Sequence, residues 1–410
     1  MAGFIDLLRS GAWLTRERVR LIALALLAAA VIGVGFLIAT SDGRNDRFGR
    51  PLGTDFSNVY AAGTYVLDGQ PAAPFDPARQ YAREQAIFGS ATPFYGWHYP
   101  PFFLGLAALL ALMPYGLALL VWQGATLALY LTSIRRILGT RDHLWLLLAA
   151  AFPAVFINLG QAHNGFLTAA LIGGALWQLD RRPWLAGLLF GLLAYKPQFG
   201  LLIPIVLMAS GRWRVFASAA VTVAVLALTL TLAFGIEVWS AFLASTKFTR
   251  TVVLEQGGTG WFKIQSVFAW VRMWGGGIAL AYAMQGAVTL AIAAALVWLW
   301  RSAAALALKA ALLIIGCVLA TPYSLDYDLM LLAPAIAFIA AHGAARGFGP
   351  YEKTILAAWW IVPLIARSVP NATLIPLAVP VMLLAFGIML RRAIDGVQVE
   401  YALARRVAAE

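Results

Sequence analysis

Asp55 is the residue of this sequence whose type and setting most suggest chemistry. It lies in the segment TDFSNVY (residues 54–60), a short way past the first long apolar stretch. The aromatic and small residues that follow predict a helix at a membrane interface, where a carboxylate can face a wet cleft. A carboxylate in that place can act as a general base that takes a proton from a hydroxyl group. A helix cap or a solvated loop would show the same residue.

Four further segments place amides, cations and carboxylates between apolar stretches. They are residues 160–165 (GQAHNG), 195–198 (YKPQ), 235–277 and 321–328 (TPYSLDYD). Gln161, His163 and Asn164 are neutral donors and acceptors suited to sugar hydroxyls, although a polar turn between helices would contain them too. Asp326 and Asp328 precede an apolar run, where the dipole of a helix amino terminus favours acidic side chains whether or not they serve a site.

Lys196 and His98 also stand out within or beside apolar stretches. A lysine at the centre of a membrane helix costs about 2.5–3.5 kcal/mol on insertion scales, and less near an interface. Lys196 therefore either extends its ammonium to the lipid headgroups or contacts an anionic group of a ligand. His98, which precedes Tyr-Pro-Pro, is either a packing residue or a hydrogen-bonding partner of phosphate or sugar.

The composition indicates a polytopic α-helical membrane protein. Of the 410 residues, 62% are hydrophobic and 12% are charged, and the mean hydropathy is +0.80, whereas about a quarter of a soluble domain is charged. The net charge of +12 lies in short arginine clusters beside helix ends, such as Arg16, Arg18 and Arg20. This pattern predicts orientation by positive cytoplasmic loops and argues against nucleic-acid binding. Cys317 is the only cysteine, which excludes an internal disulfide and a cysteine metal cluster.

Apolar stretches long enough to cross the bilayer recur along the chain and predict about twelve crossings in one domain, residues 1–410. With both ends in the cytoplasm, residues 41–99 and 235–277 form external loops. The polar segments described above then fall on the same, external face of the membrane.

Two stretches do not fit a simple crossing. Residues 100–113 are short for a span and predict a re-entrant or interfacial helix. Residues 184–209 have arginines at both ends, which one crossing cannot reconcile with positive loops inside. They predict two half-spans that break at Lys196-Pro197, because proline removes a backbone donor and disfavours helix in the residue before it.

Several of these motifs occur together in a known family. Asp55-Phe56 follows the first helix, HYPPF occupies residues 98–102, and Gly160-Gln161 precedes Asn164 in a turn. Lys196-Pro197 follows a glycine-rich helix, and Tyr327-Asp328 opens a later one. In order and spacing they resemble glycosyltransferase family 87, the polyprenyl-phosphate-sugar-dependent membrane glycosyltransferases of the GT-C fold class. Ala162-His163 departs from the more compact Gly-Gln-x-Asn pattern, which leaves the role of His163 open.

The resemblance implies an all-α GT-C-type fold with its active site on the exterior of the plasma membrane. There, an acceptor hydroxyl would displace polyprenyl phosphate from the anomeric carbon of the sugar, with inversion. The displacement needs a base, for which Asp55 is the candidate, and cations that stabilise the departing phosphate. The expected substrate-binding residues are Lys196, His98, Gln161, His163, Asn164, Arg250, Lys263, Asp326 and Asp328.

The same resemblance implies the substrates. The transferred sugar is expected to be mannose or arabinofuranose, and the acceptor a lipid- or glycan-linked hydroxyl of the cell envelope. The donor carries its own phosphate leaving group and is embedded in membrane lipid. No nucleotide, other cofactor or metal ion is therefore expected.

A multi-spanning transporter or lipid flippase is the competing interpretation, since broken helices also build binding sites at the membrane midplane. It requires polar residues near the bilayer centre and paired repeats. This chain has its polar residues near one face and no visible internal repeat. A non-catalytic partner in a cell-envelope complex is the third interpretation.

Overall fold

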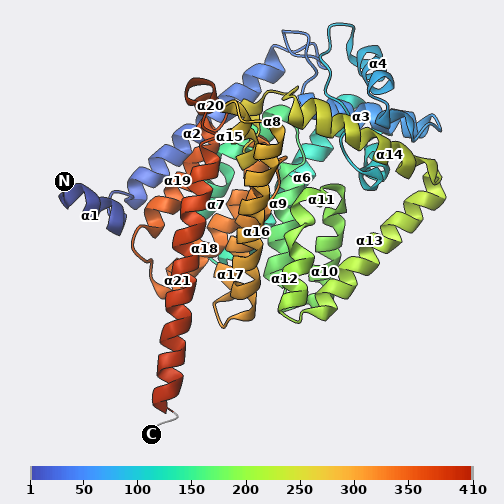
Figure 1. The fold of residues 1–410 in the computed structure, drawn as a ribbon. Coiled ribbons are helices and arrows are strands. Elements are labelled where there is room, and N and C mark those ends of the chain that lie inside the picture. Colours follow the sequence, from blue (N-terminus) through green and yellow to red (C-terminus); the bar gives the residue numbers. More distant parts are fainter. Residues whose placement is uncertain (1, 408–410) are drawn as a thin grey trace.

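The computed structural model describes residues 2–407, and the secondary structure in that range is helical (Figure 1). Its isolated β-bridges pair Asn45 with Pro51 and Ile264 with Leu325. The all-α fold predicted from the apolar stretches is therefore confirmed.

Five helices in the described range are long and apolar enough to cross a membrane. They are α2 (Arg16–Ala39), α6 (Tyr115–Leu138), α13 (Trp213–Phe234), α16 (Ile278–Arg301) and the stretch Asp326–Arg346, which joins η6 (Asp326–Leu331) to α18 (Leu332–Arg346). A sixth span results if α7 (His143–Ala150) and α8 (Pro153–Gln161), bent by 45° where they meet, cross together. Five further apolar helices have only 10–17 residues, so the expected twelve crossings stay a prediction.

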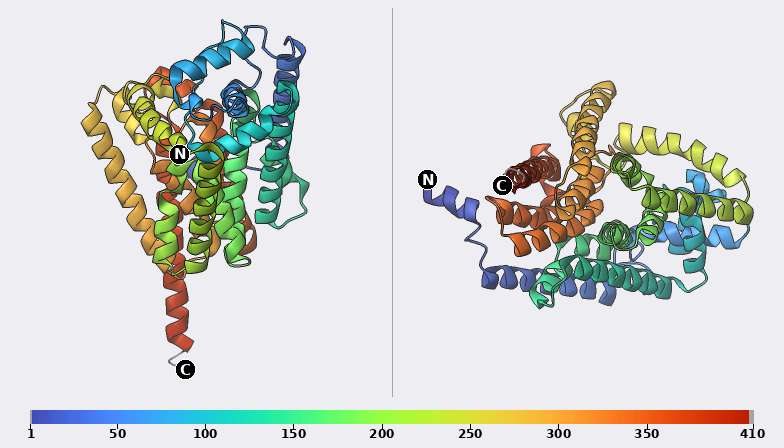
Figure 2. Two further views of the ribbon diagram at one scale, coloured as in Figure 1. Left: turned by 90° about the vertical axis from the view of Figure 1, so that its right-hand side faces the viewer. Right: turned by 90° about the horizontal axis from the view of Figure 1, so that it is seen from below.

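The centre of the bundle is α17 (Leu306–Leu319), in which every residue from Ala310 to Leu319 is buried. It packs against α12 (Leu202–Ala209), α16, α18 and α21 (Ala378–Val407). A helix that is apolar on all sides must be enclosed by other helices or lipid. The right-hand view of Figure 2 shows the orange helices of this region lying between red α21 and the green helices.

Small residues allow close packing in the other half of the bundle, where α10 (Pro183–Gly191) contacts both α13 and α9 (Gly165–Gln178). A methyl group added at Gly187 would lie 2.4 Å from the carbonyl oxygen of Val215. One added at Gly191 would lie 2.5 Å from the side chain of Thr222. Small residues at such crossings let helix backbones approach closely in a membrane protein.

Both irregular stretches have the expected local structure. In residues 184–209, α10 and η3 (Leu192–Tyr195) end at Lys196, and α11 (Pro197–Gly200) and α12 follow. The backbone of Lys196 is not helical, with φ −128° and ψ 69°. Residues 100–113 form η2 (Pro101–Phe103) and the short α5 (Leu104–Ala111). The break at Lys196-Pro197 and the short helix before residue 113 are thus confirmed.

The segments expected to be external loops lie at one end of the bundle, opposite the end of α21 (Figure 1). Residues 41–99 contain α3 (Thr54–Leu67), η1 (Ala73–Phe75) and α4 (Pro77–Phe88). Residues 235–277 contain α14 (Glu237–Phe248), η4 (Thr249–Glu255), η5 (Trp261–Lys263) and α15 (Val267–Met273). The helix predicted to begin near Asp55 is therefore present as α3.

The C-terminal part of the chain reaches this end through α19 (Glu352–Ile365) and α20 (Ser368–Thr373). The amino-terminal α1 (Ala2–Ser10) packs on α19. In turn, α20 contacts η5, and the side-chain amide of Gln265 donates to the carbonyl of Ala366 at 2.8 Å. Arg367, which directly precedes α20, is thereby held near the amino terminus of η6.

Candidate active site

A cavity with about 490 Å³ of empty space lies beside the amino terminus of α3. Its walls are polar and aromatic, and they come from α3, the segment before η2, the turn after α8, the Lys196 break and the segment around η6. The lining residues are Asp55, Asn58, Tyr95, Gly96, His98, Tyr99, His163, Tyr195, Lys196, Gln198, Tyr323, Tyr327 and Asp328.

Asp55 lies in the first turn of α3, where the helix dipole favours a negative charge. The helix begins at Gly53, whose φ of +65° is one that side chains rarely adopt. A methyl group there would also lie 2.6 Å from the side chain of Ala162. Glycine at this position therefore lets α3 start directly against the turn that follows α8.

The carboxyl group of Asp55 is surrounded by protein but keeps partial contact with solvent in the cavity. Burial raises the pKa of Asp55 to about 7, and the neighbouring Asp326 carboxylate adds to the rise. The cations of Arg367, Lys263 and Lys196 act in the opposite direction. A carboxylic acid with a pKa near neutral pH suits general-base catalysis better than one with its ordinary pKa.

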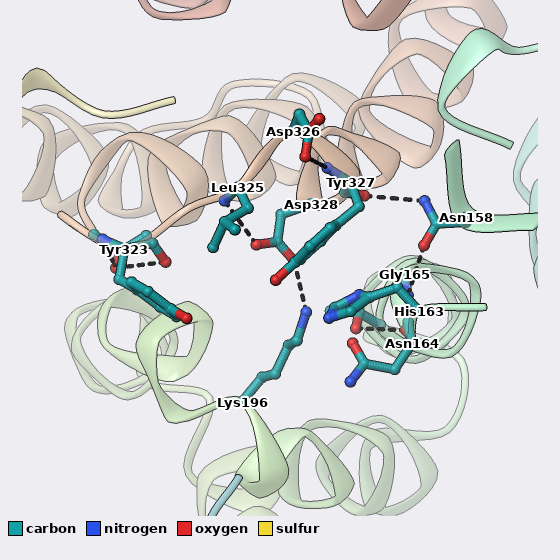
Figure 3. Close-up of polar contacts among 12 residues, drawn as sticks. Asn158, His163, Asn164, Gly165, Lys196, Tyr323, Leu325, Asp326, Tyr327 and Asp328 are labelled. Atoms are coloured by element: carbon teal, nitrogen blue, oxygen red, sulfur yellow. Dashed lines mark hydrogen bonds and ion pairs between the residues drawn. The ribbon is translucent and has the colours of Figure 1, made fainter. Parts of the chain in front are cut away.

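The side chain of Lys196 points toward Asp328, as Figure 3 shows. Its ammonium lies 2.6 Å from Oδ1 of Asp328, and the two side chains are 4% and 2% exposed. The other oxygen of Asp328 accepts the backbone N–H of Leu325 at 3.0 Å. The aromatic faces of Tyr327 and Phe199 also lie 5.4 and 5.5 Å from the ammonium. Lys196 is thus a fully enclosed cation with a matching carboxylate.

His163 packs flat against Tyr327, with their ring centroids 3.6 Å apart. Nε2 of His163 and the hydroxyl of Tyr99 are hydrogen-bonded at 3.1 Å. Asn158 ties the two segments together, because its amide donates to the carbonyl of Tyr327 at 3.1 Å and accepts the N–H of Gly165 at 3.1 Å (Figure 3). The turn after α8 and the start of η6 therefore form one continuous wall.

Asn164 follows His163 but does not line the cavity. Its side chain is buried, and neither atom of its amide has a hydrogen-bond partner among the described residues. Its backbone carbonyl accepts the hydroxyl of Thr168 at 2.9 Å, within the first turn of α9. A sugar-binding role for Asn164 stays a prediction.

His98 lies between the main cavity and a second, smaller one of about 210 Å³ of empty space, which it shares with aromatic residues of η1 and α14. Its Nδ1 is hydrogen-bonded to the hydroxyl of Thr249 at 2.9 Å. Burial lowers the pKa of His98 to about 4. The imidazole is therefore neutral at neutral pH and can donate or accept one hydrogen bond at each nitrogen.

Gln161 connects Asp55 to Arg367. Its amide nitrogen donates to Oδ2 of Asp55 at 3.2 Å, and its amide oxygen accepts from Nη2 of Arg367 at 3.0 Å. Nε of Arg367 donates to Oδ2 of Asp326 at 2.6 Å. Asp326 does not line the cavity, but it reaches Asp55 through these two side chains.

Arg250 and Lys263 do not line the cavity. Arg250 is exposed, and its Nε lies 3.6 Å from Oε1 of Glu255. The ammonium of Lys263 lies 5.7 Å from the ring centroid of Phe262. Of the expected substrate-binding residues, the structure brings Lys196, His98, His163 and Asp328 to the cavity with Asp55, and places Gln161 in contact with Asp55. A role for Arg250 and Lys263 at the substrate stays a prediction.

A brace behind the cavity was not expected from the sequence. Glu84 of α4 accepts the backbone N–H of Tyr95 at 3.1 Å. The amide of Gln80 donates both to Glu84 at 3.2 Å and to the carbonyl of Asn58 at 3.0 Å. Burial raises the pKa of Glu84 to about 7. These contacts hold α3 and the turn containing Tyr95 in place as two walls of the cavity.

The residues that sequence reasoning missed are the cavity tyrosines, Asn158, Glu84 and Arg367. Arg367 could have been noticed in the sequence, because it is a single cation between two apolar stretches. Asn158 and Glu84 had no such signal, since each acts through hydrogen bonds that the sequence pattern does not reveal. Among the described residues, no group of three or more histidine, cysteine or acidic side chains is placed to hold a metal ion.

Apolar spanning helices with a polar, tyrosine-lined cavity at one end are typical of a membrane protein with a site near one face of the membrane. The sequence model described as Glycosyltransferase family 87 matches residues 97–322, more than half of the chain. The chain therefore belongs to glycosyltransferase family 87 and is a glycosyltransferase. Comparisons with curated proteins and with solved structures gave no match. The match contains Lys196, His98 and His163, whereas Asp55 and Asp328 lie outside it.

Proposed function

We propose that this glycosyltransferase transfers a sugar from a polyprenyl-phosphate donor to an acceptor hydroxyl at the outer face of the plasma membrane. The observation that carries the proposal is the position of Asp55 and Lys196 on the walls of one cavity. A carboxylate and a cation are the two groups that displacement of a phosphate by a hydroxyl requires. Mannose and arabinofuranose are the proposed sugars, and a lipid- or glycan-linked hydroxyl of the cell envelope is the proposed acceptor.

In the proposed reaction, Asp55 accepts the proton of the acceptor hydroxyl as its oxygen attacks the anomeric carbon. The bond between that carbon and the phosphate oxygen breaks, and polyprenyl phosphate leaves with the electron pair. Attack opposite the leaving group inverts the anomeric centre. The pKa of Asp55, raised by burial to about 7, favours this proton transfer near neutral pH.

Positive charge must stabilise the phosphate as it departs. Lys196 is the cation on the cavity wall, and its pairing with Asp328 holds the ammonium at one place before substrate binds. An ammonium fixed in advance need not reorganise during the reaction. The phosphate would share it with Asp328, while neutral His98 and the tyrosine hydroxyls donate further hydrogen bonds.

The proposed orientation places the cavity end outside and the opposite end in the cytoplasm. In support, Arg181-Arg182 and Arg212 lie in the connections before α10 and before α13, away from the cavity-lining segments, as positive loops on the cytoplasmic side require. The polyprenyl chain would lie in the bilayer against apolar side chains such as those that α13 exposes. About twelve crossings, both ends inside, and a single domain complete the proposal.

The test is transfer by the purified protein in lipid nanodiscs. Synthetic polyprenyl-phosphate mannose and arabinofuranose, carrying a labelled sugar, are supplied with an acceptor extract. Labelled product is expected from one of these donors, and the Asp55→Asn variant should lose it by about a hundredfold or more. Asp68→Asn is the matched control, because Asp68 follows the same helix but pairs with Arg83 away from the cavity.

Two results would contradict the proposal in different ways. Transfer from a nucleotide sugar, with none from either lipid donor, would refute the donor class. Undiminished transfer by Asp55→Asn would remove Asp55 as the base while leaving the donor class intact. The configuration of the new glycosidic bond, read by nuclear magnetic resonance, tests inversion separately.

A further inference from the structure

Gln161 lies between a group that only donates hydrogen bonds and a group that accepts them. On one side its amide is 3.0 Å from Nη2 of Arg367, and on the other it is 3.2 Å from Oδ2 of Asp55. A guanidinium donates through all its nitrogens and does not lose its proton in proteins. The amide oxygen must therefore face Arg367, and the amide nitrogen must face Asp55.

This orientation does not depend on the protonation state of Asp55. A protonated Asp55 could itself donate a hydrogen bond, and an isolated glutamine could then rotate its amide to accept it. With Arg367 in place, rotation would bring the amide nitrogen against the guanidinium, so the hydrogen bond to Arg367 would be lost and two donors would face each other. Gln161 thus presents a donor to Asp55 both before and after the proton is taken up.

Arg367 is itself held at more than one point. Its Nε donates to Oδ2 of Asp326 at 2.6 Å, and Oδ1 of Asp326 accepts the N–H of Tyr327 at 3.0 Å. The preceding residue, Ala366, accepts the amide of Gln265 through its carbonyl at 2.8 Å. The guanidinium is therefore anchored through one edge, while its Nη2 remains directed at Gln161.

We propose that Arg367 is a positioning residue for the transfer reaction, which acts on Asp55 through Gln161. The amide holds Oδ2 of Asp55, so Oδ1 is left for the hydroxyl of the acceptor. Arg367 lies outside residues 97–322, so this assignment extends the site to the C-terminal part of the chain. The inference rests on the proposed role of Asp55 as the base.

We call the contacts from Arg367 through Gln161 to Asp55 the relay. The charges around Asp55 give this relay a measurable effect on the pH dependence of the rate. Arg367, Lys263 and Lys196 oppose the rise in the pKa of Asp55, whereas Asp326 adds to it. The other titratable groups at or beside the cavity are Glu84, Asp328, His98, His163, Tyr95, Tyr99, Tyr195, Tyr323 and Tyr327. Removing the charge of Arg367 removes a cation and a fixed donor together, so the pKa of Asp55 should rise further. The acidic limb of the rate profile should then move to higher pH.

The experiment compares Arg367→Gln, Arg367→Lys and Gln161→Ala in the donor-transfer assay across pH. Arg367→Gln should lower kcat by about ten- to a hundredfold with little change in KM, because the base is misplaced after substrate has bound. Its acidic limb should move to higher pH. Arg367→Lys keeps a positive donor and should restore the position of the limb. Gln161→Ala leaves the Arg367–Asp326 pair intact, so its loss of kcat cannot come from breaking that pair.

The double variant Arg367→Gln/Gln161→Ala should be no slower than the slower single variant, because both act on Asp55 through one route. The matched control is Arg83→Gln, which also removes an arginine paired with an aspartate, here Asp68, but away from the cavity. It should leave the limb unchanged. The relay would be refuted if the acidic limb of the rate profile stayed at its original pH in Arg367→Gln and the rate losses of the two single variants added in the double variant. If Asp55→Asn transfers normally, the proposed base fails instead, which keeps the two failures distinct.

Discussion

Breaking the buried pair of Lys196 and Asp328 separates what the pair contributes to stability from what Lys196 contributes to transfer. The charged atoms lie 2.6 Å apart, and both side chains are almost fully enclosed. Lys196→Met leaves the carboxylate buried without its cation, and removing one member of such a pair costs about 3–5 kcal/mol in unfolding free energy. Asp328→Asn leaves the ammonium without its carboxylate, and we expect a loss of similar size.

The double variant Lys196→Met/Asp328→Asn should recover most of that loss. Replacing both members of a buried pair by uncharged groups is often close to neutral. Asparagine also keeps an oxygen for the backbone N–H of Leu325, which the carboxylate accepts at 3.0 Å. A double-mutant cycle should therefore show a coupling of about 5 kcal/mol or more between the two positions, because two large single losses are replaced by one small loss.

The measurement is reversible unfolding in mixed micelles, followed by tryptophan fluorescence, with transfer assayed on the same preparations. The double variant should be stable but at least about tenfold slower, because the departing phosphate has lost its cation. Arg212→Gln is the control, since its pair with Asp180 lies at the other end and is partly exposed, the two side chains being 25% and 55% accessible. Ion pairs in contact with solvent contribute about 0–1 kcal/mol. Additive losses in the double variant would refute the coupling. Transfer that returns together with stability would show that Lys196 has no role at the phosphate.

The remaining predictions concern the proton on Asp55, the brace on α4 and the packing of α3. Transfer rates should rise with pH through about 7, because burial raises the pKa of Asp55 to about 7 and only the ionised carboxylate accepts a proton; a rate that is flat from about pH 5 to 9 contradicts this. Asp55→Asn should raise the thermal stability more at about pH 8 than at about pH 5. The native carboxyl holds its proton up to about pH 7, whereas the unfolded chain releases it near the ordinary pKa of 3.8. The stability of the native protein therefore falls as the pH rises between those two values, and asparagine removes this loss. Glu84→Ala should lower the unfolding free energy by about 1–3 kcal/mol in urea titrations, because the buried N–H of Tyr95 loses its acceptor. Gly63→Ala places a methyl group 2.1 Å from a backbone carbonyl of α5 and should lower the unfolding free energy by about 1–3 kcal/mol or more. Its control, Gly124→Ala, has nothing within 4 Å of the added methyl group and should stabilise the protein slightly.

The local features that the sequence predicts are those that single residue types impose. Proline cannot continue a helix, so the break after Lys196 and the short helix that begins at Pro101 are visible in the sequence. The same holds for α3, which begins where glycine and a polar residue precede an apolar run. The alternation of charged loops was enough to predict that residues 41–99 and 235–277 lie at the same end of the bundle. The number of crossings remains a prediction, because helices shorter than a full span alternate with long ones.

The contacts within the site could not be predicted, because they join residues far apart in the chain. Lys196 and Asp328 are 132 residues apart, and Asn158 and Tyr327 are 169 residues apart. Each of these residues has an ordinary local explanation, as a snorkelling lysine, a helix cap or a polar residue in a turn. Their pairing becomes evident only when α8, the Lys196 break and η6 pack together. Arg367 is a stronger example. Its proposed role depends on its contact with Gln161, and neither the sequence pattern nor the composition links these two residues.

Most of the polar residues of this site lie where an apolar helix starts, stops or breaks, and this has a physical cause. Irregular backbone in a membrane protein must find hydrogen-bond partners within the protein, since lipid offers none. The side chains that supply them are the ones that also face the cavity or support its wall: Asp328 accepts the N–H of Leu325, and Asn158 accepts that of Gly165. A substitution that deletes such a side chain therefore damages backbone and site together, and lost activity alone says little about chemistry. Substitutions that keep the backbone contact and remove both buried charges together, such as the double variant Lys196→Met/Asp328→Asn, are the ones whose rates report on the reaction.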